Sequence, residues 1–335
     1  MNKQMSFFDL TDELAQVRTH KKEYLSQIEQ LIPWGEWEAI VKPYYYQGER
    51  GNKPYDLNLM LHLHILQNLY DLSDMGTAAE VIDSRAFSDF CSVSSNQVPD
   101  GDTIGRFRNL LVKNGLQQQF FAQVLKTLTG RGLILKKGTI VDSTIIAAPS
   151  STKNEGKKRD PDAASTKKGT TWHFGYKAHI GVDKDSGLVH YVKATAANEH
   201  DVNVVPDLMT KEEEVMYGDS GYVGAEKRKE AVTRNTKGRK IRYKMNRKPS
   251  QYRNKSPRSQ AQIKHHERAK SSIRAKVEHV FGVVKKLFKY RKTRYRGLEK
   301  QTEKLNMMFA LANLYLADKH GLLAEYSGGG KPPVR

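Results

Sequence analysis

The sequence predicts an α/β protein in which an all-helical N-terminal region precedes a mixed sheet with flanking helices. Three observations predict this class. Apolar residues recur at three- and four-residue spacing within about residues 12–130, short β-rich runs occupy about 131–245, and a long basic helix and an apolar helix follow. The chain has 335 residues, which is enough for two or three domains with a substantial core.

The N-terminal region contains one clear helix signal and one ambiguous signal. Pro54-Tyr55-Asp56 is a start signal, and apolar residues at helical spacing follow it through Leu69. His62 and His64 are two positions apart, which is wrong for two ligands on one helical face, so we predict that both are packing residues. Val98–Leu111 has a second start signal followed by arginines. It fits either the recognition helix of a helix-turn-helix module or an amphipathic helix with exposed arginines.

The middle region has strand character. Its first strand is Thr139–Ile146, and a lysine-rich loop at 153–168 follows. Asp183–Gly187 supplies turn chemistry between two β-rich runs, which indicates a hairpin. The remaining predicted elements are the hairpin strands Trp172–Val182 and Leu188–Ala194, a short helix after Asn198–Asp201, a strand Met216–Asp219, a helix near Gly224 and a strand Lys240–Met245.

Positive charge is concentrated in one segment. The formal net charge is +19, and residues 227–300 contain 27 lysines and arginines against four acidic residues. Such a segment is expected to neutralise phosphates, so we predict nucleic-acid binding; the alternative is a solvated face or a flexible tail. Aromatic side chains among basic ones favour nucleic acid, because they pack on sugars and bases. The tyrosines in this segment are Tyr243, Tyr252, Tyr290 and Tyr295.

The last part of the chain is first basic and then apolar. Arg247 to about Ala261 has too few apolar residues to fold alone, so we expect it to become ordered on DNA. A long helix is predicted from there to about Tyr290, and Gly297 separates it from an apolar closing helix. The predicted domains are a helical domain for DNA binding or dimerisation at 1–130, an α/β domain at 131–296 with a basic insertion at about 246–262, and a closing helix with a flexible tail at 297–335.

Cysteine content and hydropathy restrict the cellular compartment. The single cysteine, Cys91, excludes an intramolecular disulfide framework and a cysteine-based zinc site, and it indicates a reducing cytoplasm. We predict that Cys91 is a small buried apolar residue. The first ten residues have no sustained apolar stretch, so we expect no secretion signal. Leu305–Ala317 falls short of the roughly 20 residues needed to span a bilayer and is predicted to be a core helix.

Three acidic residues lie in local patterns that would bring them to one edge of the sheet. Asp142 lies within the first strand, Asp219 ends a later apolar run, and Glu278 lies on the long helix. At about 100° per residue, Arg274, Glu278 and Lys285 fall at about 0°, 40° and 20° on that helix and share a narrow face. The apolar flank beside this face is expected to dock on the sheet.

Carboxylates in this arrangement suit divalent metal chemistry. Carboxylate oxygens are the hard ligands that Mg²⁺ prefers, and two ions about 3.5–4 Å apart activate an attacking oxygen and stabilise a leaving one. The pattern therefore predicts that Asp142, Asp219 and Glu278 form a two-metal phosphoryl-transfer site that cuts and joins DNA, with Arg274 and Lys285 holding phosphates. Ordinary structural roles remain open: a buried aspartate for Asp142, a turn residue for Asp219, and an ion-pair face on the helix.

At these residues the chain resembles the DDE transposases of bacterial insertion sequences, specifically the group named after insertion sequence five. The resemblance covers nearly the whole chain, including the helical region around Pro54-Tyr55-Asp56-Leu57. The matching blocks are Val141–Ile146 with Ala148–Lys153, Trp172–His179, Ala196–Asp201, Gly218–Tyr222, and Arg274–His279 with Lys285. The group often has a tyrosine three positions before the arginine, where this chain has Ser271, which puts a tyrosine-dependent DNA contact at that position in doubt.

The resemblance implies a ribonuclease H-like catalytic core over 131–296, with a mixed five-stranded sheet that carries Asp142 on its first strand and Asp219 on its fourth. It implies two Mg²⁺ ions, for which Mn²⁺ substitutes, and hydrolysis at each element end to free 3′-hydroxyls that attack target DNA. The implied partners are the terminal repeats, target DNA and a second copy of the chain, at the bacterial nucleoid and without a membrane. Predicted DNA contacts are Lys153, Lys177, His179, Arg247, Lys248, Arg253, Arg294 and Arg296.

Two other functions fit the same residues. One is a catalytically silent, transposase-derived DNA-binding regulator, which would bind DNA equally well without Glu278. The other is a ribonuclease H-like structure-specific nuclease, which would need no terminal repeats. We predict packing rather than base stacking for Trp172, leave His173 unassigned, and predict that His200-Asp201 caps the following helix with Asp201 at the cap. All four of these residues stay outside the predicted catalytic set.

Overall fold

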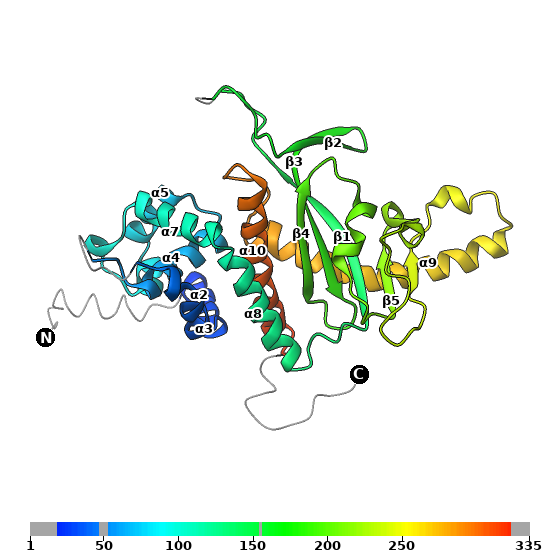
Figure 1. The fold of residues 1–335 in the computed structure, drawn as a ribbon, viewed down its shortest axis with the longest axis horizontal. Coiled ribbons are helices and arrows are strands. Elements are labelled where there is room, and N and C mark those ends of the chain that lie inside the picture. Colours follow the sequence, from blue (N-terminus) through cyan, green and yellow to red (C-terminus); the bar gives the residue numbers. More distant parts are fainter. Residues whose placement is uncertain (1–18, 47–52, 154–155, 323–335) are drawn as a thin grey trace, which may run out of the picture.

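The computed structural model describes residues 19–46, 53–153 and 156–322. Figure 1 shows helices at one end of the molecule, a curled sheet in the middle and a projecting helix at the other end. The predicted α/β class with a helical N-terminal region is confirmed. The first ten residues and the flexible tail expected after the closing helix of 297–335 lie outside the described residues, so the predictions made for them stay predictions.

The helical region packs around one deeply buried helix, α4. Asp56 caps α4 as predicted, because its carboxylate accepts a hydrogen bond from the amide of Leu59 at 3.1 Å. His62 and His64 are 5% and 3% exposed, and Cys91 is buried, so all three predicted packing roles are confirmed. The α-helices of this region are α2 His20–Leu31, α3 Trp34–Val41, α4 Leu57–Leu69, α5 Asp74–Asp83, α6 Arg85–Cys91, α7 Gly101–Lys113 and α8 Leu116–Gly130, with 3-10 turns at Lys42–Tyr44 and Ser95–Gln97.

Helix α7 is the one whose role the sequence left open. Arg108 points inward and forms a bidentate ion pair with Asp74, at 2.9 Å from Nε to Oδ1 and 2.8 Å from Nη2 to Oδ2. Its guanidinium lies over the Tyr295 ring, 3.8 Å from the centroid. Tyr290 is buried and Tyr295 is half-buried beneath Arg108, so both tyrosines pack against the protein. The expectation that Tyr290 contacts nucleic acid is wrong. Helix α7 carries two arginines, Arg106 and Arg108, and only Arg106 is exposed.

The sheet in the described part of the chain has six strands. Strand β1 lies between β3, to which it is antiparallel, and β5, to which it is parallel. Strand β6 extends the sheet parallel to β5, and β3 also pairs antiparallel with β2 and β4. The strands are β1 Gly138–Ala147, β2 Ala164–Lys168, β3 Thr171–Asp183, β4 Val189–Ala196, β5 Val215–Gly218 and β6 Arg242–Met245.

The predicted count of five strands is wrong by one. The additional strand is β2, which lies in the stretch predicted as a lysine-rich loop. Its side chains are exposed or only partly buried, so no alternation of apolar and polar residues marks it in the sequence. Backbone pairing with the start of β3 forms the strand, and any residue type except proline can supply both the donor and the acceptor of those hydrogen bonds. Asp219 consequently follows the fifth strand of the sheet rather than ending the fourth.

Helix α10, Leu298–Lys319, packs between the helical region and the sheet (Figure 1). Most of its residues are buried, so the prediction of a core helix over Leu305–Ala317 is confirmed. Glu303 accepts hydrogen bonds from the amides of Gln117 and Gln118 at the start of α8. On the opposite side, the Asn313 amide exchanges two hydrogen bonds with the backbone of Val189 on β4. One helix therefore binds both halves of the molecule through polar contacts as well as apolar ones.

The long basic helix, α9, spans Pro257–Gly282 and continues as a π-helical turn, Val283–Leu287. It begins earlier than predicted, because Ser256 caps it by accepting a hydrogen bond from the amide of Ser259. The segment expected to be ordered only on DNA is therefore partly helical in the isolated chain. The remaining elements are 3-10 helices at Asp201–Leu208 (η3), Ser220–Tyr222 (η4), Ala225–Lys227 (η5) and Pro249–Gln251 (η6). Among the described helices, none has a long enough apolar stretch to cross a membrane.

One buried acid makes stability depend on pH. Glu213 is fully buried, and burial raises the pKa of its carboxyl from 4.5 to about 7. The folded protein therefore binds this proton more tightly than the unfolded chain, so the free energy of unfolding should fall as the pH rises from about 4.5 to about 7. The slope from one group is at most about 1.4 kcal/mol per pH unit. Urea unfolding of Glu213→Gln should show this component of the pH dependence removed; an unchanged pH profile would contradict the assignment.

Candidate active site

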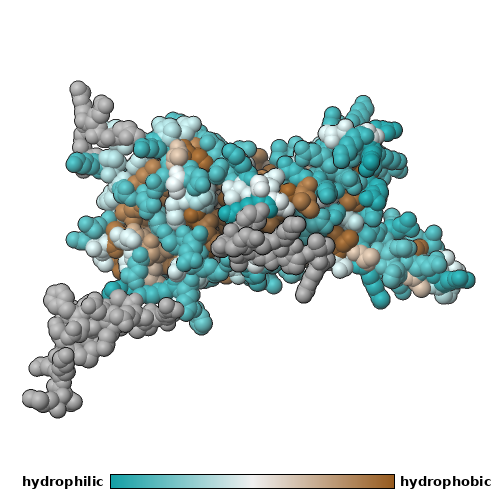
Figure 2. Space-filling view, turned by 90° about the horizontal axis from the view of Figure 1, so that it is seen from below, coloured by the Kyte–Doolittle hydropathy of each residue, from teal (hydrophilic) through white to brown (hydrophobic). Residues whose placement is uncertain are grey.

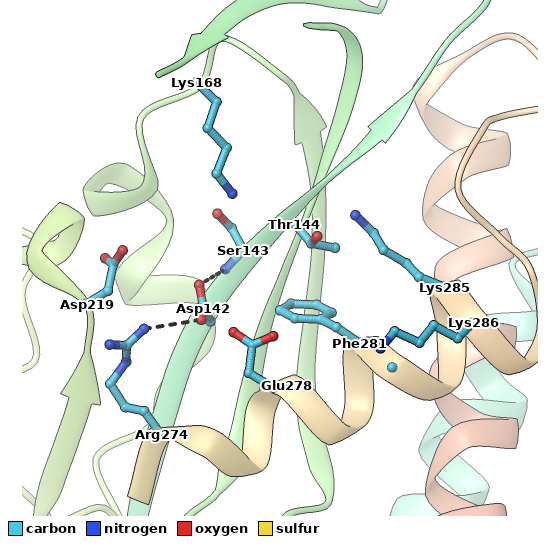
Figure 3. Close-up of a pocket in the computed structure, with 11 residues that line it drawn as sticks. Asp142, Ser143, Thr144, Lys168, Asp219, Arg274, Glu278, Phe281, Lys285 and Lys286 are labelled. Atoms are coloured by element: carbon cyan, nitrogen blue, oxygen red, sulfur yellow. Dashed lines mark hydrogen bonds and ion pairs between the residues drawn. The ribbon is translucent and has the colours of Figure 1, made fainter. Parts of the chain in front are cut away.

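The three predicted acids line one open pocket of about 490 Å³ (Figure 3). Asp142 comes from the middle of β1, Asp219 follows β5, and Glu278 lies on α9. Three elements distant in sequence therefore meet at one place. The full lining is Asp142, Ser143, Thr144, Lys168, Asp219, Arg274, Glu278, Phe281, Gly282, Lys285 and Lys286.

Asp142 is largely enclosed at the base of this pocket. Its side chain is 17% exposed, and its Oδ1 accepts a hydrogen bond from the amide of Ser143 at 2.8 Å. Burial raises the pKa of its carboxyl to about 6, against the opposing effects of the Ser143 amide and Arg274. Asp219 and Glu278 add to the rise, because two more negative charges face the same space. A bound cation would relieve this repulsion.

Asp219 reaches the pocket because β5 runs parallel to β1. The register pairs Ile140 with Tyr217, and the two acids follow these paired residues by two positions each at the same edge. Asp219 also caps the 3-10 helix η4 by accepting a hydrogen bond from the amide of Gly221 at 2.7 Å. The turn role and the pocket position predicted as alternatives are thus combined in one residue.

Glu278 is held toward the sheet by the apolar flank of α9. Val277, Val280 and Phe281 are buried, as expected for a helix face that docks on a sheet. Arg274 and Lys285 line the same pocket as Glu278, so the shared face predicted from helical spacing is present. Lys285 remains on this side although it lies in the π-helical turn, where the advance per residue differs from that of an α-helix.

Two of the cations in the pocket, Arg274 and Lys285, are held by specific partners. Arg274 contacts Asp142 at 3.4 Å, from Nη2 to Oδ2, and donates from Nη1 to Oδ1 of Asn246 at 2.9 Å. Lys285 donates from Nζ to the carbonyl of Ile145 at 2.8 Å. Burial lowers the pKa of Lys285, and the nearby charge of Lys168 lowers it further. The pocket therefore has positive groups on its rim as well as acids at its base.

Asn246 and Lys168 are site residues that the sequence analysis did not identify. Asn246 follows β6, donates from its backbone amide to the carbonyl of Gly218 at 3.0 Å and orients Arg274 through its side chain. Its position after the last parallel strand was a signal that could have identified it, since such strand ends share an edge with Asp219. Lys168 lines the pocket from the end of β2, and no sequence pattern marked it because β2 itself was not predicted.

The donor set suits a divalent metal, although the acids do not form a closed cage. In the described residues, no group of three or more His, Cys, Asp or Glu side chains is close enough to enclose an ion. The carboxylates line the same pocket, and the Arg274 guanidinium supplies the positive charge beside Asp142. Hard oxygen donors and mutual repulsion among the acids are the features expected of a site for Mg²⁺ or Mn²⁺. The residues that would hold the ions are Asp142, Asp219 and Glu278.

The predicted DNA contacts divide into two groups. His179 has no exposed side-chain surface, and Lys177 is 13% exposed and paired with Asp201 at 3.1 Å. The prediction that His179 contacts DNA is therefore wrong, and Lys177 is occupied inside the protein. The other predicted contacts are exposed: Lys153, Arg247, Lys248, Arg253, Arg294 and Arg296. Arg294 also lies 3.4 Å from Asp71.

The residues left outside the catalytic set also differ from expectation. Trp172 is 67% exposed near the tip of the β2–β3 hairpin, so the prediction that it packs in the protein is wrong. His200, not Asp201, is the cap of η3, and its Nδ1 accepts a hydrogen bond from the amide of Val202 at 3.3 Å. Asp201 instead accepts hydrogen bonds from the side chains of Ser143 and Lys177.

A mixed sheet that brings three carboxylates and several cations to one pocket defines a site suited to phosphoryl transfer. Comparison with known protein families agrees with this class. Residues 134–314 match the family described as Transposase DDE domain, and residues 12–110 match the one described as Transposase domain (DUF772). The first match covers more than half of the chain. The protein therefore belongs to the DDE transposase family, whose members generally use divalent metal ions.

Proposed function

We propose that this chain is a transposase of the insertion sequence five group, which binds the ends of its element, hydrolyses the phosphodiester at each end and joins the 3′-hydroxyls to target DNA. The observation that carries the proposal is the convergence of Asp142, Asp219 and Glu278 on one pocket with Arg274 and Lys285. The order of the strands also supports a ribonuclease H-like core: β1 pairs antiparallel with β3 and parallel with β5, and β6 pairs parallel with β5.

The carboxylates and the cations of the pocket would have different parts in this reaction. Two Mg²⁺ ions, held by the three carboxylates, would activate the attacking oxygen and stabilise the leaving one. Arg274 is fixed by Asn246 and is placed to hold a phosphate beside Asp142 once an ion neutralises that carboxylate. Lys285 and Lys168 line the pocket wall and would bind flanking phosphates. The open pocket suits a polymer that passes across the site.

The DNA-binding surface in this proposal extends along a basic arm, defined as residues 246–270. The arm projects from the body of the molecule, and its end is largely hydrophilic in the space-filling view (Figures 1 and 2). Its one acid, Glu267, is engaged by Asn246, Lys270 and the amide of Arg247. Its exposed basic residues are Arg247, Lys248, Arg253, Lys255, Arg258, Lys264 and Arg268.

The salt dependence of DNA binding tests whether the basic arm contacts DNA. Replacing Lys248 and Arg253 together by glutamine should weaken DNA binding and reduce the slope of log affinity against log salt by about 2, since each neutralised phosphate contributes about 0.9 to that slope. Fluorescence anisotropy with a labelled duplex at several salt concentrations measures both quantities. Lys126→Gln, which changes an exposed lysine of α8, is the matched control for a change of charge. An unaltered slope of log affinity against log salt in the double variant would show that Lys248 and Arg253 do not contact DNA.

The proposed activity is tested with purified protein and end-labelled DNA that contains the flanks of its own gene, with and without Mg²⁺. Metal-dependent breaks at discrete flanking positions, followed by joining to a second duplex, are expected. Binding without any cleavage would favour a catalytically silent regulator. Cleavage governed by branched DNA shape and not by the flanks would favour a structure-specific nuclease. Assembly of the protein on paired ends should produce at least a dimer.

A further inference from the structure

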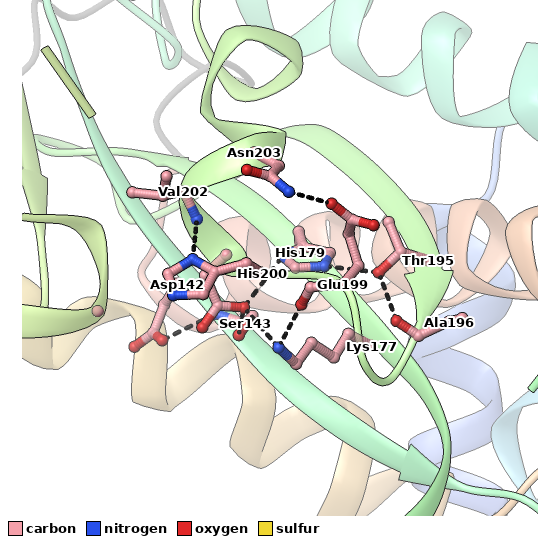
Figure 4. Close-up of polar contacts among 12 residues, drawn as sticks. Asp142, Ser143, Lys177, His179, Thr195, Ala196, Glu199, His200, Val202 and Asn203 are labelled. Carbon is pink, nitrogen blue, oxygen red and sulfur yellow. Dashed lines mark hydrogen bonds and ion pairs between the residues drawn. The ribbon is translucent and has the colours of Figure 1, made fainter. Parts of the chain in front are cut away.

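A connected polar network lies on the face of β1 opposite Asp142 (Figure 4). Along β1, Ile140 belongs to the large core on the α9 side and Val141 to the smaller core under η3, so successive side chains alternate between these faces. Asp142 accordingly shares the α9 side with Glu278. Ser143 turns to the other side, where its register partner on β3 is His179. Asp201, the first residue of η3, lies over this second face.

Asp201 is the centre of the network. Its Oδ1 accepts hydrogen bonds from Oγ of Ser143 at 2.9 Å and from Nζ of Lys177 at 3.1 Å. Lys177 also donates to the carbonyl of Glu199 at 2.6 Å, which fixes the lysine to the loop before η3. His179 lies 3.7 Å away, but burial lowers its pKa to about 4, so it is neutral near pH 7. Lys177 therefore supplies the positive charge that lies beside the Asp201 carboxylate.

The network reaches both strands that carry the proposed metal ligands. Ser143 joins the two faces of β1, because its hydroxyl donates to Asp201 while its amide donates to Oδ1 of Asp142. On the neighbouring side, a Cβ added to Gly221 would lie 3.7 Å from Oδ2 of Asp201 and 3.0 Å from Oδ1 of Asp219. Asp201 thus packs against the turn that holds Asp219.

Strand β1 needs such support at this point. Its pairing with β5 ends at Ile140, and among the described residues the next backbone partner on that edge is the segment around Lys292, which bridges to Ala147. Residues 141–146 therefore have no ladder partner on the edge facing the pocket. Asp142 and Ser143 are paired only with β3 on the other side. A side-chain bond from Ser143 to a fixed carboxylate restricts the motion that this missing partner would allow. Metal ligands depend on such supporting contacts for their orientation.

We propose that Asp201 is a positioning residue, which acts through Ser143 to hold Asp142 in the orientation that metal binding requires, with Lys177 as its counter-ion. The proposal rests on the assignment of Asp142, Asp219 and Glu278 as metal ligands made above. This role explains why Ser143, Lys177 and Asp201 are linked. DNA contact does not explain it, because Lys177 is enclosed, and helix capping does not explain it, because His200 is the cap of η3.

Mn²⁺ binding by the DNA-free protein, followed by the decrease of the free-ion electron paramagnetic resonance signal, tests the proposal without relying on activity. Ser143→Ala and Asp201→Ala should each weaken Mn²⁺ binding about 10- to 100-fold, the usual effect of removing a contact that orients a metal ligand. The double variant should bind no more weakly than Asp201→Ala, because both changes break one chain of contacts. Asp207→Asn is the matched control, since Asp207 lies on the same 3-10 helix in an exposed pair with Lys193.

If Asp201→Ala fails to fold, Ser143→Ala alone tests the positioning role, because the Ser143→Ala change leaves the Lys177–Asp201 pair intact. Its metal-free melting temperature should stay close to that of the wild type while Mn²⁺ affinity falls. Wild-type Mn²⁺ affinity in Ser143→Ala, beside abolished affinity in Glu278→Gln, would overturn the positioning role alone. Equal affinity in the wild type and Glu278→Gln would overturn the proposed metal site and this inference with it.

Discussion

Glu278→Gln should slow DNA cleavage by at least about 10³-fold while DNA affinity stays within about twofold of the wild type. Glutamine keeps the size of the side chain but removes one negative charge from a pocket where three carboxylates face the same space. Loss of about 4 kcal/mol of metal-dependent stabilisation corresponds to about 10³ in rate. Single-turnover cleavage of end-labelled DNA measures the rate, and anisotropy measures the affinity.

The matched control for this change is Glu80→Gln, which removes the same charge from an exposed position on α5. It should cleave at close to the wild-type rate. Retained cleavage in Glu278→Gln would disprove the three-carboxylate site. A parallel loss of cleavage and DNA binding would indicate instead that Glu278 supports the DNA surface rather than the chemistry.

Asp74→Ala should lower the free energy of unfolding by about 3–5 kcal/mol, the usual effect of leaving one partner of a buried ion pair alone. Arg108 is 10% exposed at its side chain and would lose both of its bonds to the Asp74 carboxylate. The same carboxylate accepts hydrogen bonds from Gln67 at 2.6 Å and from the Tyr295 hydroxyl at 3.0 Å. Although burial raises the pKa of Asp74, its bonds to Arg108 hold it below the ordinary value. Urea denaturation measures the change.

An exposed ion pair in the neighbouring helix provides the comparison. Arg85 and Asp89 are four positions apart on α6, at 3.2 Å from Nε to Oδ1, and Arg85 is 53% exposed at its side chain. Arg85→Ala should change stability by less than about 1 kcal/mol, because solvent screens the pair. A similarly small effect for Asp74→Ala would show that Arg108 finds another partner and that the junction between α5, α7 and Tyr295 does not depend on this pair.

Sequence patterns predicted those parts of the protein in which local chemistry and position in the fold agree. The start signal at Asp56 and the apolar run of α10 gave the right helices, because capping and periodic burial act over a few residues. Helical spacing also placed Arg274 and Glu278 on one face before the fold was known. Strand β2 was missed because only its backbone pairing with β3 makes it a strand, and no local sequence pattern indicates that pairing.

The sequence by itself determined which residues are candidates for the chemistry: three acids, an arginine and a lysine, each within a local element that could be predicted. Tertiary structure alone decided which other polar residues serve them. Asn246, Lys168 and Asp201 reach the site across the sheet or from its edge, and only the fold brings them there. The same folding enclosed His179 and Arg108 and exposed Trp172. Burial depends on contacts between distant segments, so the type of a residue does not decide whether it faces DNA or the core.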